Sequence, residues 1–297
     1  MKTSFGQGLD RLIWGNYYTY YNKVGYSAPY ISFFSMQMIR LINFIIVFLI
    51  WATNIYINMK KGCLYIYMWG LTFATLALGY LFVSSGRQVV ERKMEEKGDP
   101  VDSKDKSTTW KHGVFFYTLA LPFVFTANIL FYVFLRNDLK DQIVRDLLRE
   151  GESDSWRIYF IWAAHIVPLL ALMIDFALNR LVMAYWHVLI SIALTGLYFF
   201  GTYVGQLAQQ TKAIYLHHLS WMTDKNSYTG KEVAPDWKAN GINIGTTFAL
   251  IIIFHLLITF GSNSKSAAYF QMDAERRESE HISGKHAKLL AEDDEKI

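Results

Sequence analysis

Long apolar runs that recur along the chain are the feature that most constrains its fold. Each run approaches the roughly 20 residues that a helix needs to cross a hydrocarbon core, and polar stretches separate the runs. The sequence therefore predicts an all-α integral membrane protein: a bundle of about six transmembrane helices with both termini on the same side. The predicted spans are Leu41 to Ile57, Leu64 to Ser84, Gly113 to Leu135, Ile158 to Leu178, Ala184 to Val204 and Ile242 to Phe260, of which the first and the last are the shortest.

Composition agrees with this prediction and excludes several other classes. The 297 residues are 53% hydrophobic and only 18% charged, which is more apolar surface than a soluble core can bury. Because Cys63 is the only cysteine, no internal disulfide or thiolate metal cluster is possible. The sequence contains no zinc-protease, nucleotide-loop or nucleophile-elbow motif and no basic patch interleaved with aromatics, so we expect no metal, no organic cofactor and no nucleic-acid partner.

The chain divides into three predicted parts. Residues 1–36 are rich in Tyr and Gly and resemble a segment that lies at the level of the lipid headgroups. Residues 37–262 form the transmembrane domain, and residues 263–297 form a charged tail whose composition is typical of disorder. Lys and Arg are more frequent on the side that holds both termini, which predicts that the termini face the cytosol or the mitochondrial matrix.

Polar side chains inside the spans are the candidate functional residues, because burying them in lipid is costly. A helix advances about 1.5 Å per residue, so depth shows which of them can meet. Thr72 and His165 lie seven or eight residues into two parallel spans, and Thr126 falls near the same level in an antiparallel one. We therefore expect Thr72 and His165 to share one site.

Two interpretations of this pair remain open. A hydroxyl beside an imidazole, shielded from water, can perform nucleophilic acyl transfer, with Thr72 attacking an ester carbonyl and His165 taking its proton. In the alternative, Thr72 bonds a carbonyl of its own helix and His165 bonds a neighbouring hydroxyl or a lipid headgroup.

Asp175 lies much closer to the side of the termini than His165. Arg40, at the head of the first span, and Arg180, just after the fourth, lie near the same face. We expect a structural ion pair between Asp175 and one of these arginines, with a catalytic or proton-relay role as the alternative.

Short motifs in this chain are similar to those of the androgen-induced membrane hydrolases, a family that includes the androgen-dependent regulator of tissue factor pathway inhibitor. The resemblance covers roughly residues 40 to 262. Trp69 precedes Leu71, Thr72 and Phe73 in the second span, and His165 is followed by Pro168 and Asp175 in the fourth. Further similar stretches are Leu119 to Pro122, Leu135 to Asp138, Tyr215 to His218 and Gly245 to Thr247. The chain has Trp162 where family members often have a second His.

The resemblance implies a six-span hydrolase of fatty acid esters of hydroxy fatty acids, with Thr72 as nucleophile and His165 as its partner. In this hypothesis Thr126 or Asn128 stabilises the oxyanion, membrane lipids are the partners, and the protein lies in the endomembrane system. The alternative is a non-catalytic subunit of a large membrane complex, in the mitochondrial inner membrane for instance, that binds other subunits through its N-terminus, long loops and charged tail.

Overall fold

The computed structural model describes residues 28, 31–57, 62–97, 109–135, 155–209, 219–225 and 232–294 of the chain. In this part, six helices are long and apolar enough to cross a membrane. They are α2 (Phe33–Ile57), α3 (Ile66–Lys97), α4 (Thr109–Leu130), α6 (Ser155–Leu178), α7 (His187–Gln209) and α8 (Trp237–Asp294). The prediction of an all-α, six-helix, multi-pass membrane protein is confirmed, and the side of the termini stays a prediction.

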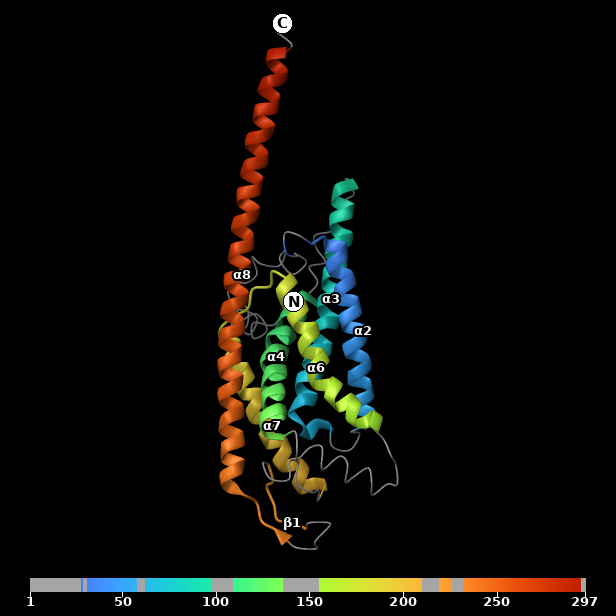
Figure 1. The fold of residues 1–297 in the computed structure, drawn as a ribbon, viewed down its shortest axis with the longest axis vertical. Helices are drawn as coiled ribbons and strands as arrows, with labels where there is room; N and C mark the ends of the chain where they lie inside the picture. The colour runs from blue at the N-terminus through green and yellow to red at the C-terminus, as the bar shows by residue number, and fades with distance from the viewer. Residues whose placement is uncertain are drawn as a thin grey trace, which may run out of the picture.

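Four short elements complete the described chain. The 3-10 turn η2 (Gly62–Leu64) precedes α3, and the π-helical turn η3 (Phe131–Leu135) continues α4. Strand β1 (Asp224–Lys225) pairs antiparallel with β2 (Glu232–Val233) at the end of the bundle where α8 begins (Figure 1).

Helix α8 corrects the prediction for the C-terminal part of the chain. We expected the last span to end at Phe260 and to be among the shortest, but the helix continues without a break to Asp294. Its far end projects well beyond the other helices (Figure 1). The physical reason is that residues 263–294 contain no Pro and many Ala, Glu, Lys and Leu, which favour helix even where apolar periodicity has ended. The first 27 residues of the predicted headgroup-level segment lie outside the described residues, and its last residues, from Phe33 on, belong to α2.

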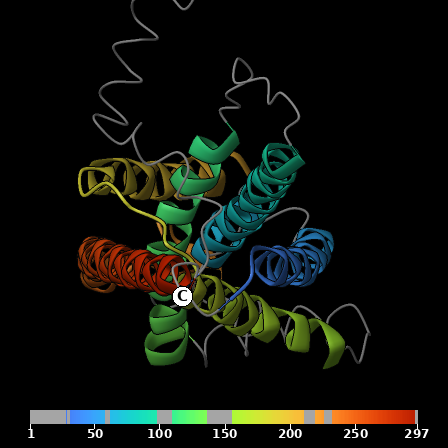
Figure 2. The same ribbon diagram turned by 90° about the horizontal axis from the view of Figure 1, so that it is seen from above.

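Helix α4 is the central helix of the bundle. It packs against α3, α6, α7 and α8, and most of its side chains are buried (Figure 2). The outer helices instead expose large apolar side chains such as Leu49, Leu189, Phe200 and Phe260. Because lipid tails solvate apolar groups, this exposed surface is the expected lipid-facing side of a membrane bundle.

Candidate functional site

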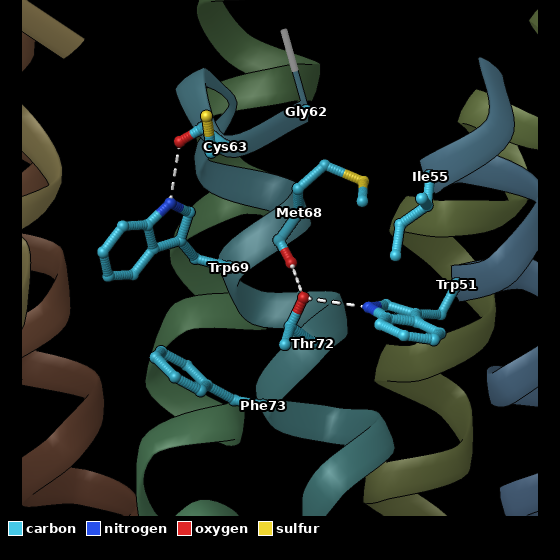
Figure 3. A pocket seen from close by; sticks show the side chains of 8 residues that line it. All are labelled: Trp51, Ile55, Gly62, Cys63, Met68, Trp69, Thr72 and Phe73. Carbon is cyan, nitrogen blue, oxygen red and sulfur yellow. Dashed lines mark hydrogen bonds between the residues drawn. The ribbon is translucent and has the colours of Figure 1, made fainter. Parts of the chain in front are cut away.

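A cavity of about 360 Å³ lies between α2 and α3, near the end of the bundle that holds η2. Figure 3 shows its lining, which is mostly apolar and aromatic. The lining residues are Trp51, Ile55, Gly62, Cys63, Met68, Trp69, Thr72 and Phe73. Thr72 supplies the only hydroxyl among them, and Cys63 contributes a free thiol.

Two hydrogen bonds hold the Thr72 hydroxyl in place. It donates to the backbone carbonyl of Met68 at 2.7 Å, and its oxygen accepts from the indole N–H of Trp51 at 3.0 Å (Figure 3). Back-bonding of this kind is ordinary for Thr in a helix. A carbonyl cannot take up the hydroxyl proton, so in this conformation Thr72 is not activated as a nucleophile.

Trp51 is a site residue that the sequence analysis missed. A depth comparison can find it, because Trp51 lies six residues before the end of α2 at Ile57, and Thr72 lies six residues after the start of α3 at Ile66. On two antiparallel neighbouring helices, these positions fall at the same level. The indole N–H is a donor that must find an acceptor when buried, and Thr72 provides it.

Trp69 closes the η2 end of the cavity. Its indole N–H donates to the backbone carbonyl of Cys63 at 2.9 Å, which fixes the turn η2 onto α3. Its ring packs edge-on against Phe73 and Tyr198. The wall of the cavity is therefore built of rings whose positions are set by hydrogen bonds and by ring packing.

His165 is buried on α6, among aromatic rings. Its ring stacks on Phe131 with centroids 4.0 Å apart and lies 4.7 Å from the ring of Tyr67. Its Nδ1 is 2.8 Å from the carbonyl oxygen of Ile161. Because a carbonyl only accepts, Nδ1 must carry the hydrogen, and in the neutral ring Nε2 is then a proton acceptor.

The structure does not join Thr72 to His165 by a hydrogen bond. Tyr67, which contacts His165, and Thr72, which contacts Trp51, are five residues apart on α3, so their side chains leave the helix about 140° apart. His165 is also not among the residues that line the cavity. The bond of Thr72 to Met68 is the one that the alternative interpretation describes, whereas His165 bonds a backbone carbonyl of its own helix rather than a hydroxyl or a lipid headgroup. A catalytic role for the pair stays a prediction.

Asn128 and Thr126 differ in whether they still have a free hydrogen-bond donor for an oxyanion. The amide nitrogen of Asn128 donates to the carbonyls of Val124 and His165, each at 2.8 Å, so both of its hydrogens are used. Asn128 thereby ties α4 to α6 and has no donor left for an oxyanion. Thr126 is fully buried, and within the described chain its hydroxyl has no hydrogen-bond partner, but it does not line the cavity.

Asp175 forms its ion pair with Arg40. Nε of Arg40 lies 2.8 Å from Oδ1 of Asp175, and both side chains are completely buried. Asn179 donates to the other carboxylate oxygen at 2.7 Å. Arg180 instead lies over the rings of Tyr269 and Phe270 on α8.

Two further residues that the sequence analysis did not name join this network. The ammonium of Lys265 on α8 donates to the carbonyl of Phe176 and to Oδ1 of Asn179. The hydroxyl of Tyr117 on α4 donates to the carbonyl of Leu172 at 3.0 Å and accepts from Asn179 at 3.2 Å. The network thus links α2, α4, α6 and α8 at the end of the bundle from which α8 projects.

In the part of the chain that the structure describes, no group of three or more His, Cys, Asp or Glu side chains is placed to hold a metal ion. No protein family model, no curated protein and no solved structure matches the chain. The fold and the site therefore define its class by themselves: a six-helix multi-pass membrane protein with an aromatic cavity between α2 and α3, in which Thr72 is the one hydroxyl among the described lining residues.

Proposed function

We propose that the protein is an intramembrane hydrolase of lipid esters and that the cavity between α2 and α3 is its substrate site. The observation that carries this proposal is the placement of Thr72 as the one hydroxyl in an otherwise mostly apolar cavity. The motif resemblance around Thr72 and His165 supports the same chemistry and favours fatty acid esters of hydroxy fatty acids as substrates. Such amphipathic molecules would enter sideways from the bilayer.

In the proposed mechanism, Thr72 attacks the ester carbonyl and His165 accepts its proton on Nε2. The hydroxy fatty acid leaves with that proton, and water then releases the acyl group from Thr72. The mechanism requires the Thr72 hydroxyl to leave the Met68 carbonyl and α6 to bring His165 within hydrogen-bond reach. Thr readily provides the first change, because in helices it populates two χ1 rotamers.

Trp51 is the proposed donor to the developing oxyanion. Its N–H already lies 3.0 Å from the Thr72 oxygen, which is the atom that would attack. When Thr72 turns away, this N–H is free to donate to the substrate carbonyl oxygen.

A matched pair of variants tests this proposal. Thr72 and Thr75 both lie on α3 and both donate to a carbonyl four residues back, but only Thr72 lines the cavity. Purified wild-type protein, Thr72→Ala, His165→Ala and the control Thr75→Ala would be assayed on a panel of lipid esters. We expect turnover to fall at least about 100-fold in the first two variants and to stay near wild type in Thr75→Ala. A wild-type protein that is inactive on the whole panel, or a Thr72→Ala protein that is as active as wild type, would contradict the proposal.

A non-catalytic subunit of a membrane complex is the second candidate, and two observations favour it. Thr72 and His165 bond carbonyls of their own helices rather than each other, and α8 continues past its span as a long helix (Figure 1). This candidate predicts that the protein extracted gently from its native membrane migrates as part of a large defined complex.

For either candidate, we propose that the termini face the cytosol or matrix. The hydrolase would belong to the endomembrane system and the subunit to the mitochondrial inner membrane.

A further inference from the structure

Exposed tyrosine and tryptophan side chains gather at the end of the bundle that holds η2. Among the described residues, six of the seven exposed Tyr and Trp side chains lie there, and they are Tyr56, Tyr132, Trp156, Tyr159, Tyr203 and Trp237. They belong to α2, η3, α6, α7 and α8, which all begin or end at this end of the bundle (Figure 1). Tyr and Trp are enriched where hydrocarbon meets lipid headgroups, because their side chains are amphipathic. These six side chains, which we call the aromatic belt, therefore mark the headgroup level at the η2 end.

The exposed face of α2 agrees with this level. Its exposed apolar side chains run from Phe34 to Tyr56, which is a step of 22 residues. At about 1.5 Å per residue this is about 33 Å, close to the roughly 30 Å of a hydrocarbon core. Helix α2 therefore crosses the core once, with Tyr56 at the boundary on the η2 side.

The cavity of Thr72 lies just beneath the aromatic belt. Trp51 bonds Thr72 and so marks its level on α2, five residues before Tyr56. The Thr72 hydroxyl is therefore about 8 Å below the belt, whereas the middle of the hydrocarbon core is about 15 Å below it. Phe73, which lies furthest along α3 among the lining residues, is only one residue deeper. The whole cavity is thus contained in the half of the bilayer at the η2 end.

The exposure of the lining residues shows where the cavity opens. Ile55, which precedes Tyr56, is 40% exposed, and Cys63 on η2 is exposed as well. The other described lining residues are buried or half-buried. Figure 3 shows Ile55 and Cys63 at the end of the cavity away from Phe73. The mouth of the cavity therefore lies between Ile55 and Cys63, close to the level of the aromatic belt.

The size and the lining of the cavity limit what it can hold. Its volume is about 360 Å³. Groups as large as a water molecule occupy about 30 Å³ each, so the cavity holds about twelve of them. This is room for one short aliphatic chain but not for the two chains of a phospholipid. No Asp, Glu, Lys or Arg is among the described lining residues, so a charged lipid end would be buried there without a partner.

We propose that the cavity takes single-chain lipids from one leaflet only, the leaflet at the η2 end, which is opposite the projecting part of α8 (Figure 1). The chain lies beside the rings of Trp51 and Trp69 and reaches toward Thr72. The polar end of the lipid remains outside the mouth, at the level of the headgroups. We base this substrate class on the proposed function, in which the cavity is the substrate site.

The reactivity of Cys63 with a membrane-impermeant maleimide tests the proposal, because Cys63 is the only cysteine of the chain and lies at the mouth. Wild-type protein would be reconstituted in phosphatidylcholine vesicles. Maleimide added outside would label only the molecules whose η2 end faces out. The probe is dodecyl sulfonate, a single-chain lipid whose permanent charge makes its passage across a bilayer slow. Dodecyl sulfonate added outside should slow the labelling several-fold, and dodecyl sulfonate trapped inside should have no effect.

A matched pair of variants shows whether this protection comes from the cavity. Ile55 and Ile46 are both exposed on α2, at 40% and 44%, but only Ile55 lines the cavity. Ile55→Trp fills the cavity, so external dodecyl sulfonate should no longer slow the labelling of Cys63. Ile46→Trp should be protected as well as wild type. Elution of each variant as a single folded peak in detergent would show that the bundle is intact.

Several results would overturn the proposal. One is a Cys63 that external maleimide labels in detergent but not in intact vesicles, because the mouth would then not be at the surface. Others are equal protection by dodecyl sulfonate on either side, protection that persists in Ile55→Trp, and equal protection by phosphatidylglycerol, which has two chains.

The labelling of Cys63 measures occupancy of the cavity rather than turnover, so the two proposals fail separately. Protection of Cys63 in a protein that hydrolyses none of the lipid esters contradicts the hydrolase alone. Turnover of lipid esters without any protection of Cys63 contradicts the single-leaflet cavity alone.

Discussion

At the scale of single residues, Thr72 and His165 each bond a carbonyl four residues back on their own helix, and this shows what the sequence could and could not predict. The depth of Thr72 and His165 follows from counting residues along a helix, so it is available before the structure is known. The direction in which each side chain points depends on the rotation of the helix, which tertiary packing sets. Spacing alone therefore left both interpretations of the pair open.

The ion pair between Arg40 and Asp175 is the residue-scale feature with the sharpest consequence for stability. Replacing either residue by Leu leaves the other as a buried charge whose principal partner is gone, and we expect each change to destabilise the protein by about 3–5 kcal/mol. The double variant should lose much less than the sum of the two, because it removes both charges together. Denaturant unfolding in detergent, followed by circular dichroism, would measure these differences. Single variants that unfold at the same denaturant concentration as wild type would show that the pair is not structural.

At the scale of elements, the helices α3 and α4 approach each other through glycine at both ends of their contact. A Cβ on Gly70 would lie 3.2 Å from the backbone nitrogen of Val124, and one on Gly113 would lie 3.2 Å from that of Leu81. Both contacts fit one antiparallel register of the two helices. Gly70 and Leu81 are eleven residues apart on α3, and Gly113 and Val124 are eleven residues apart on α4. Small residues that let backbones come close are the usual basis of helix packing in membranes.

Substitution of these glycines tests how tightly the two helices are held. Gly70→Ala and Gly113→Ala should destabilise the bundle by about 1–3 kcal/mol, because the neighbouring atom is rigid backbone and the helices must separate. Gly196→Ala on α7 is the matched control, since nothing lies within 4 Å of its Cβ position. The control should be neutral or up to about 1 kcal/mol stabilising from helix propensity alone. Thermal unfolding in detergent would compare the stabilities of the three variants. Equal effects at all three positions would mean that the close approach of α3 and α4 does not determine the stability of the bundle.

The boundaries of the elements were predictable only where hydrophobicity changes sharply. The starts of the four middle helices lie within four residues of the predicted starts, since lipid exposure requires an apolar surface. The ends of α3 and α8 do not follow the apolar runs, because the residues beyond Ser84 and beyond Phe260 still favour helix after the run has ended. A hydropathy argument marks where a span can leave the bilayer but not where its helix ends.

At the scale of the whole molecule, the six helices form one bundle around α4, and the cavity of Thr72 lies between α2 and α3. The hydrolase proposal depends on α2 and α3, which line the cavity, and on α6, which carries His165. The exposed apolar surface of the outer helices allows a lipid substrate to reach the bundle from within the bilayer.

The most direct test of the central claim is to find which residue becomes covalently modified by an ester-like reagent. Purified protein would be treated with a long-chain fluorophosphonate, which transfers its phosphonyl group to an activated hydroxyl, and then digested and examined by mass spectrometry. The account predicts one phosphonyl group on the peptide that contains Thr72, and none on the Thr72→Ala protein. An unmodified Thr72, or a group attached to a different residue, would contradict it.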